Sequence, residues 1–351
     1  MKSLVLTQPP ASVCIVRLSA VGDITHALPV VRTLQQHWPQ TQLTWVIGRT
    51  EHSLVEDIPG IEFIVFGKKQ GLRAYRHLRQ QLAQRQFDVL LHMQMSFRAS
   101  LVTLLIRAPI KLGFDTQRAK DLQWLFTTHR ITNQPKQHVI DSFFGFTEAL
   151  GIPEHHTVWD IPIPADAEHF AAKHLPTDKA LLIISPCSSM AYRNWHVAGY
   201  AAVADYAATQ HGMRVVLTGG PTAIERDYAD KIQAKCHIPP LDLVGKTTLK
   251  QLLAVLRRAR IVIAPDAGAA HLANAVGVPV ISLYATTNPD RARPYNWPQY
   301  VVNKYPEAIL AKFGRSVAEV PWGTRVRDRG TMDRITVMDV IPLIDRVLLE
   351  H

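Results

Sequence analysis

Short apolar runs alternate with amphipathic segments along most of the chain. The run at residues 12–18 (SVCIVRL), for example, precedes a segment with apolar residues at helical spacing, 25–39 (THALPVVRTLQQHWP), which places Pro29 in the first turns of a helix. Short continuous apolar runs are typical of parallel strands buried on both faces, and helical spacing is typical of the helices that cover them. The alternation predicts βαβ units around mainly parallel sheets, and therefore an α/β protein.

The alternation occurs twice, on either side of a proline-rich stretch at 151–170 that we interpret as a linker. Strands are predicted at 12–18, 42–48, 61–66, 87–94 and 110–114, and again at 180–186, 214–220, 241–245, 260–266 and 278–285. We expect an N-terminal Rossmann-like domain over 1–165, a C-terminal one over 166–335, and a final helix over 336–351 that packs back towards the first domain. Two such domains have parallel sheets facing a central cleft, where ligands of open α/β sheets bind.

Composition and charge narrow the class of protein. The chain has 351 residues, is 47% hydrophobic and carries a formal net charge of +10, which indicates an anionic partner. No apolar run is long enough to span a bilayer, and the N-terminus is a poor secretory signal. Three cysteines lie far apart without metal-ligand spacing. We expect a cytoplasmic protein without a metal site.

The segment 261–297 carries the most informative chemistry. A predicted strand ends at Pro265, and Asp266 can cap the helix that follows. Small residues after it, including Ala267 and Gly268, allow a ligand to approach the backbone, and the N-terminus of a helix suits a phosphate. His271 in the first turn could add a hydrogen bond. A capped helix with an incidental histidine is the alternative.

A second turn of interest follows the first strand. Residues 17–29 (RLSAVGDITHALP) contain a single glycine with a carboxylate, Asp23, beside it. Phosphate-binding turns usually lack carboxylates because anions repel each other. From the residues alone, Asp23 is as well explained by a helix cap as by a catalytic base.

Four segments in the correct order resemble glycosyltransferase family 9, the ADP-heptose:lipopolysaccharide heptosyltransferases, and most closely heptosyltransferase I. They are the turn at 17–29 with its continuation to 48, the stretch from 113 to 143, the loop TGGPTAIERDYA at 218–229, and PDAGAAHLANAVGVPVISLYATTNP at 265–289. The resemblance implies a GT-B fold and inverting transfer of heptose from ADP-heptose to the Kdo/heptose inner core of lipopolysaccharide. It also implies no cofactor and no essential metal.

The resemblance assigns roles to residues. Asp23 would be the base that takes the proton of the acceptor hydroxyl. Residues that would bind the donor are Ser188, Ser189, Arg193, Glu225, Thr247, Asp266, Ala267, Gly268 and His271. Arg193 stands where the family has lysine. Asp227 competes with Glu225 for the ribose, and Thr247 could instead cap a helix together with Thr248.

The acceptor side is expected to be basic. We favour Lys68, Lys69, Arg118 and Lys120 as ligands of the acidic acceptor, because they stand in predicted turns; a solvated basic surface is the alternative. The expected partners are a nucleotide sugar, an anionic lipopolysaccharide precursor and, by peripheral contact, the cytoplasmic face of the inner membrane, but no nucleic acid. Two other functions stay open: a family 9 enzyme with another donor or acceptor, and a non-catalytic protein that binds polyanions.

Overall fold

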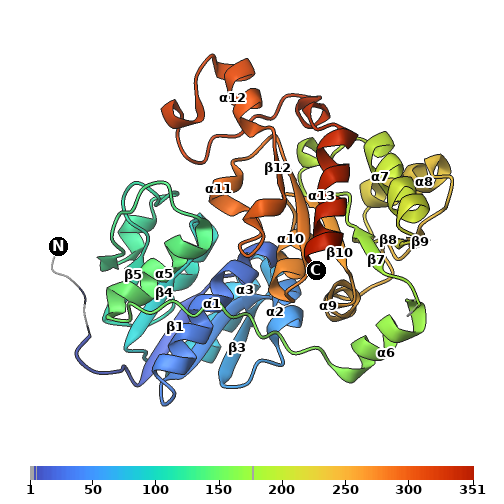
Figure 1. The fold of residues 1–351 in the computed structure, drawn as a ribbon. Helices are drawn as coiled ribbons and strands as arrows, with labels where there is room; N and C mark the ends of the chain where they lie inside the picture. The colour runs from blue at the N-terminus through green and yellow to red at the C-terminus, as the bar shows by residue number, and fades with distance from the viewer. Residues whose placement is uncertain (1–3, 5, 176–177) are drawn as a thin grey trace. The chain divides into compact units, whose positions relative to one another are not determined.

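The computed structural model describes residues 4, 6–175 and 178–351. The chain folds into two compact units, residues 1–162 and 163–351. Each unit contains a six-stranded parallel sheet with helices packed on it (Figure 1). The predicted α/β class with two Rossmann-like halves is confirmed.

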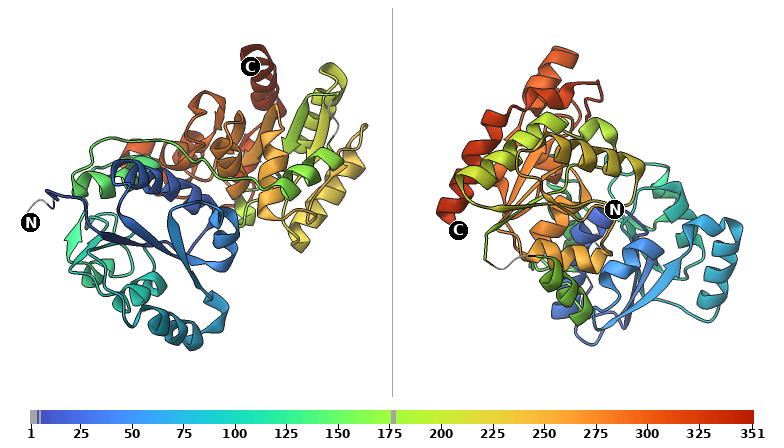
Figure 2. Two further views of the ribbon diagram at one scale, coloured as in Figure 1. Left: turned by 90° about the horizontal axis from the view of Figure 1, so that it is seen from below. Right: turned by 90° about the vertical axis from the view of Figure 1, so that its right-hand side faces the viewer.

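In the first unit the strands follow the order β3-β2-β1-β4-β5-β6, and every neighbouring pair is parallel. The strands are β1 (Ser12–Val16), β2 (Gln42–Gly48), β3 (Ile61–Phe66), β4 (Val89–His92), β5 (Ile110–Gly113) and β6 (His129–Arg130). The helices are α1 (Val21–His37), α2 (Arg49–Val55), α3 (Leu72–Leu82), α4 (Phe97–Leu104) and α5 (Val139–Leu150), with the 3₁₀ turns η1 (Lys68–Gln70) and η2 (Gln123–Phe126). Helices lie above and below the strands of this unit in the left view of Figure 2.

Helix α1 begins four residues earlier than predicted, so Pro29 lies in its interior rather than in its first turns. A proline has no N–H and therefore leaves the carbonyl of the residue four positions earlier without its helical donor. Here that carbonyl belongs to Thr25, and it accepts a hydrogen bond of 2.7 Å from Nε1 of the buried Trp159. The indole N–H thus replaces the backbone donor that the proline lacks.

The segment predicted as a linker is partly fixed to the first unit. Arg32 of α1 donates through Nε to the carbonyl of Trp159 at 3.2 Å and pairs with the carboxylate of Asp160, also at 3.2 Å. The segment then ends at α6 (Ala165–His174), which is a helix of the second unit. The prediction of an irregular linker over 151–170 is confirmed for residues 152–164, which form neither helix nor strand, and is wrong for residues 165–170, which belong to this helix. Periodicity in the sequence could not reveal how Arg32 contacts this segment, because these residues are far apart in the chain.

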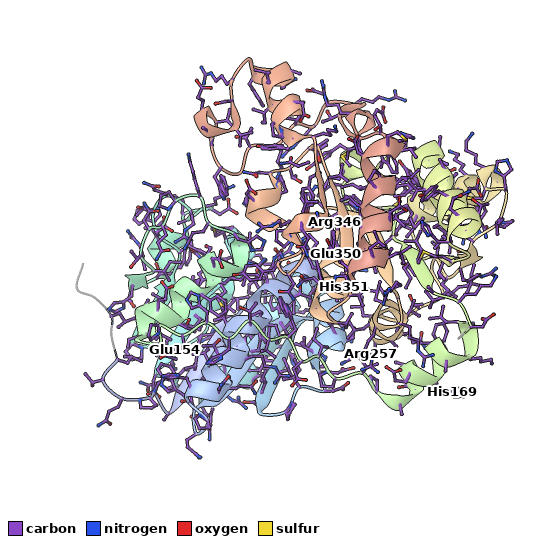
Figure 3. All side chains as sticks on the ribbon, in the orientation of Figure 1. Glu154, His169, Arg257, Arg346, Glu350 and His351 are labelled. Atoms are coloured by element: carbon purple, nitrogen blue, oxygen red, sulfur yellow. The ribbon has the colours of Figure 1, made fainter. Side chains whose placement is uncertain are left out.

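In the second unit the order is β12-β11-β10-β7-β8-β9, again entirely parallel. Its strands are β7 (Leu181–Ile184), β8 (Arg214–Leu217), β9 (Leu241–Asp242), β10 (Ile261–Pro265), β11 (Val280–Tyr284) and β12 (Val301–Asn303). Its further helices are α7 (Val197–Gln210), α8 (Ala223–Lys235), α9 (Leu249–Arg257), α10 (Gly268–Ala275), α11 (Pro289–Ala292), α12 (Tyr305–Phe313) and α13 (Val337–Glu350). Figure 3 labels His169 on α6 and Arg257 on α9, where Arg257 pairs with Glu168.

The C-terminal helix belongs to the second unit. Val340, Ile344 and Val347 of α13 are fully buried in the same apolar core as strands of this unit. Tyr300, also in that core, lies within hydrogen-bond distance of His351 at the end of the chain (Figure 3). The expectation that this helix turns back to the first domain stays a prediction.

Candidate functional site

Each sheet has one topological switch point, where the chain leaves one strand and later returns on its other side. In the first unit the switch point lies between β1 and β4, and in the second between β7 and β10. Loops at the carboxyl ends of such strands diverge and leave room for ligands. The predicted base Asp23 follows β1, whereas the predicted phosphate residues follow β7 and β10.

At the first switch point two side chains join the loops that follow β1 and β4. Arg17, which is buried, donates through Nη1 to the carbonyl of Met93 at 2.6 Å. Gln94 accepts from the backbone N–H of Leu18 at 2.6 Å. The turn that carries Asp23 is therefore anchored by groups that the sequence analysis did not single out. Their only sequence signal is a polar residue at the end of an apolar run.

Asp23 occupies the third position of α1 and is half-exposed. Its Oδ2 accepts from the N–H of Ala20 at 3.0 Å and pairs with Nη2 of Arg17 at 2.7 Å. The side chain of Asp23 is 43% exposed while that of Arg17 is 8% exposed. The carboxylate thus caps the helix, as one reading proposed, and is oriented by a buried cation while it remains open to solvent. Nothing in this arrangement conflicts with a role as a base.

Two histidines lie behind this turn. Nδ1 of the buried His26 is 4.0 Å from Oδ1 of Asp23. His138 caps α5, and its ring meets that of His26 edge-on at 6.0 Å. A histidine near a carboxylate can share in proton movement. Neither histidine was singled out from the sequence, although His26 lies in the segment 17–29 and His138 in the segment 113–143.

The four predicted acceptor ligands divide into two kinds. Lys68 pairs with the buried Glu51 at 3.0 Å. Arg118 pairs with the buried Asp115 and donates to Ser142, so that it holds neighbouring loops together. Their structural contacts compete with the proposed role, which stays a prediction.

Lys69 and Lys120 are exposed, and among the described residues no hydrogen bond or ion pair of either ammonium group is recorded. They are the better candidates for an anionic ligand. Lys69 lies in η1 and Lys120 lies just before η2.

At the second switch point Arg193 joins the loops after β7 and β10. Its Nη1 is 3.1 Å from Oδ2 of Asp266 and donates to the carbonyl of the same residue at 3.2 Å. Asp266 also accepts from the hydroxyl of Thr287 at 2.9 Å. Both charged side chains are largely buried, at 15% and 13% exposure. The buried Nε of Arg193 has no hydrogen-bond partner among the described residues, which leaves it a donor for a ligand.

The prediction that Asp266 caps the following helix is wrong. Helix α10 has Ala267 as its N-cap, and no side chain accepts a hydrogen bond there. Asp266 is instead held by the charge of Arg193, which lies far away in the sequence. The N-terminus of α10 consequently keeps backbone N–H groups for another acceptor. Gly268 opens this helix and His271 is buried in it.

The other predicted donor residues lie on the loops after β7 and β9 and, for Glu225, in the first turn of α8. Ser188 is buried, and its N–H donates to Asn194 at 2.7 Å, whereas Ser189 is exposed. Thr247 is half-buried, and the neighbouring Thr248 caps α9. Of the two threonines that could cap this helix, Thr248 is therefore the cap. The N–H of Gly245 donates to the carbonyl of Gly219 at 2.9 Å, so the loops after β8 and β9 are joined.

Glu225 and Asp227 differ in their surroundings. Glu225 accepts from the N–H of Gly220 at 2.8 Å and from the hydroxyl of Thr222 at 2.6 Å, so it faces the loop after β8. Asp227 is exposed and pairs with Lys231 at 2.7 Å. Burial, with the nearby charges of Glu225 and Asp227, raises the pKa of Cys187 to about 12, so this thiol stays neutral. The geometry favours Glu225 for a ligand in this region.

A small cavity adjoins Asp266. Its lining is strongly basic and includes Arg193, Arg291 and Arg325, which the sequence analysis did not all single out. Arg325 is brought here by a bridge to Thr287. The described part of the chain contains no cluster of three or more metal-ligating side chains. The positive charge that lines this cavity comes from its arginines, and the N-terminus of α10 adds a partial positive charge.

Comparison with known proteins places the chain in a family. Residues 75–322 match the family "Glycosyltransferase family 9 (heptosyltransferase)". A lipopolysaccharide core heptosyltransferase (OpsX) of Haemophilus influenzae is 43% identical over 335 residues, which cover 95% of this chain and 96% of that protein. Lipopolysaccharide heptosyltransferase 1 of Escherichia coli K12 is 24% identical over 320 residues, 88% of this chain and 98% of that protein.

Solved structures show the same fold. A family 9 glycosyl transferase of Veillonella parvula has a TM-score of 0.80 at 22% identity, covering 100% of this chain and 99% of that chain. The E. coli heptosyltransferase WaaC with ADP has a TM-score of 0.71 at 21% identity, covering 96% and 99%.

The fold and the match define a GT-B glycosyltransferase. The chain belongs to glycosyltransferase family 9, the heptosyltransferases. The predicted family, fold class and enzyme class are confirmed, and the non-catalytic alternative is disfavoured.

Proposed function

We propose that this protein transfers heptose from ADP-heptose to the inner core of a lipopolysaccharide precursor. The observation that carries the proposal is the pairing of Arg193 with Asp266 beside the N-terminus of α10, in a chain of the heptosyltransferase family. An arginine with an unpartnered Nε and a helix N-terminus is suited to a diphosphate.

The chemistry follows from these groups. The acceptor hydroxyl oxygen attacks the anomeric carbon of the heptose while its proton passes to the carboxylate of Asp23. The bond between that carbon and the phosphate oxygen breaks, and ADP leaves with the bonding electrons. Negative charge then grows on the diphosphate, where Arg193 and the N-terminus of α10 stabilise it.

The remaining roles complete the proposal. Glu225 binds the ribose, and Thr247 lies near the adenine. The small residues Ala267 and Gly268 admit the phosphates to the backbone, with His271, Ser188 and Ser189 nearby. Lys69 and Lys120 bind the acidic acceptor, with support from Lys68 and Arg118. Transfer needs neither a cofactor nor a metal ion.

The protein acts at the cytoplasmic face of the inner membrane by peripheral contact. No helix in the described part of the chain is long and apolar enough to cross a bilayer. The proposed acceptor is held in a membrane, which is why we propose peripheral contact.

ADP release tests the function. Incubation with ADP-heptose and a Kdo-bearing acceptor should release ADP, and a chelator such as EDTA should leave the rate unchanged. Release of UDP from UDP-sugars, with no release of ADP from ADP-heptose, would contradict ADP-heptose as the donor. A rate that EDTA abolishes and Mg²⁺ restores would contradict metal-independent transfer.

A further inference from the structure

Four large apolar side chains are exposed together on the first unit. Phe97 begins α4, while Leu122, Trp124 and Leu125 lie in and beside η2. They are 54%, 56%, 46% and 58% exposed, respectively. The rings of Phe97 and Phe126 meet edge-on at 6.3 Å, which brings the two segments together. We name these four residues the apolar edge surface.

This surface is held in place by polar groups that point inward. Gln123, in the middle of the exposed stretch, is fully buried and donates through Nε2 to the carbonyl of His92 at 2.9 Å. Its Oε1 accepts from the N–H of Phe114 at 3.2 Å. Asp121 accepts from the N–H of Phe97, also at 3.2 Å. The glutamine is thus buried while its apolar neighbours face solvent, the reverse of the usual preference.

The backbone of this turn is strained as well. Asp121 and Leu122 have φ angles of 52° and 56°, in the left-handed region that favours glycine. A non-glycine residue in this region is unfavourable and persists only where its surroundings hold it. The fold therefore stabilises an arrangement that keeps Leu122, Trp124 and Leu125 outside the core.

The surroundings of the apolar edge surface are basic. Between residues 67 and 107 the only acidic residue is Asp88, and it is bonded to Ser12. The same stretch contains Lys69, Arg73, Arg76, Arg79, Arg98 and Arg107, besides Lys68 and Arg85, which are paired with Glu51 and Glu62. Helix α3, which carries three of these arginines, packs into the same core as α4. Exposed Arg98 directly follows Phe97, and exposed Lys120 lies two residues before Leu122, with Asp121 between them.

We propose that the apolar edge surface, with its basic surroundings, docks on the surface of an anionic lipid bilayer. The inference rests on the proposed function, whose acceptor is held in a membrane. Tryptophan, phenylalanine and leucine enter the interface between headgroups and acyl chains, and lysine and arginine attract anionic lipids. Exposed Asp121 is the acidic residue within this surface, and the exposed basic residues around it outnumber it, which favours an anionic bilayer over a protein of mixed charge.

Vesicle sedimentation tests the docking. The test variant is Trp124→Ser with Leu125→Ser. The matched control is Leu310→Ser with Phe313→Ser, because these residues on α12 of the second unit are 61% and 43% exposed. The wild type and the control should sediment with vesicles of phosphatidylcholine and phosphatidylglycerol, and less so with phosphatidylcholine alone or at high salt. The test variant should bind at least roughly tenfold more weakly, since it lacks two apolar side chains that the bilayer would bury.

A second variant tests the charge. Arg98→Glu should weaken binding to the anionic vesicles and leave binding to neutral ones unchanged. Both variants should melt at the wild-type temperature, because the substituted side chains are exposed.

The outcomes separate this proposal from the proposed function. ADP release with a water-soluble, delipidated acceptor should be equal in the wild type and the Trp124/Leu125 variant. If the wild type releases no ADP from ADP-heptose with any acceptor, the proposed function is contradicted. Vesicle binding is then still a separate result. Docking is overturned if the wild type does not bind anionic vesicles, or if the Trp124/Leu125 variant binds them like the wild type. It is also overturned if the substitutions only dissociate a dimer of this chain.

Discussion

Both switch points pair a largely buried arginine with an aspartate, and they differ in the burial of the aspartate. In the first unit a buried Arg17 holds a half-exposed Asp23, whereas in the second both Arg193 and Asp266 are largely buried. A carboxylate that is oriented but exposed can reach the proton of a substrate. A carboxylate enclosed with its arginine instead fixes the position of that arginine. We propose that the first unit takes the proton and the second binds the nucleotide.

The largest expected effect follows from replacing the exposed carboxylate. In Asp23→Asn the amide cannot accept the proton of the acceptor hydroxyl, so kcat should fall on the order of 10²- to 10⁴-fold. The rate of ADP release measures this. Asp227→Asn, which removes an exposed carboxylate paired with Lys231, is the matched control and should retain near-wild-type kcat. Wild-type kcat in Asp23→Asn would refute the base.

The next effect concerns the enclosed pair. Arg193→Ala removes a charge-assisted donor to the diphosphate and should weaken ADP binding by about 1–3 kcal/mol. Calorimetric titration with ADP measures the loss. Arg193→Lys, which restores the charge without the planar fork, should recover part of the affinity. Unchanged affinity in Arg193→Ala would remove this residue from the donor site.

A stability effect comes from His92 at the end of β4. Burial, together with the charges of Arg17 and Lys111, lowers the pKa of His92 to about 3. Because the folded state lowers this pKa, its contribution to stability is complete above the unfolded value and is lost as the pH falls towards 3. Between pH 7 and pH 5 the free energy of unfolding should drop by about 2 kcal/mol on this account.

His92→Gln provides the check. Urea unfolding at a series of pH values should give a flatter profile for this variant than for the wild type. Parallel profiles would mean that the histidine is not the group that titrates.

The smallest expected effect concerns the hydrogen bond between Trp159 and the carbonyl of Thr25 in α1. Trp159→Phe leaves the carbonyl of Thr25 without its donor and should lower the free energy of unfolding by about 1 kcal/mol beyond the small loss of packing. Combining it with Pro29→Ala restores a backbone N–H at that position, so the double variant should lose less than the sum of the two single losses. Strictly additive losses in thermal melts would contradict the pairing.

The sequence predicted ten of the twelve strands in the described residues, because buried parallel strands appear as apolar runs, but it missed the short edge strands β6 and β12. Its errors concern contacts between distant residues. The start of α1 was placed too late because Pro29 suggested a first turn, and the donor that makes an interior proline tolerable is Trp159. Asp266 was expected to cap a helix because its partner, Arg193, lies on another loop.

The candidate site was only partly accessible for the same reason. Motifs identified Asp23 and the loops of the second unit. They could not identify Arg17 or Gln94, whose roles depend on the parallel pairing of β1 with β4. Motifs also could not show that Arg118 forms an ion pair with Asp115, whereas Lys69 and Lys120 are exposed.

The most direct test of the division between the two units is the dissociation constant of ADP-heptose measured on Asp23→Asn and on Asp266→Asn. The account predicts that Asp23→Asn binds the donor like the wild type although it fails to release ADP, and that Asp266→Asn, with Arg193 no longer held by a charge, binds it more weakly. Loss of donor binding in Asp23→Asn, with wild-type binding in Asp266→Asn, would contradict it.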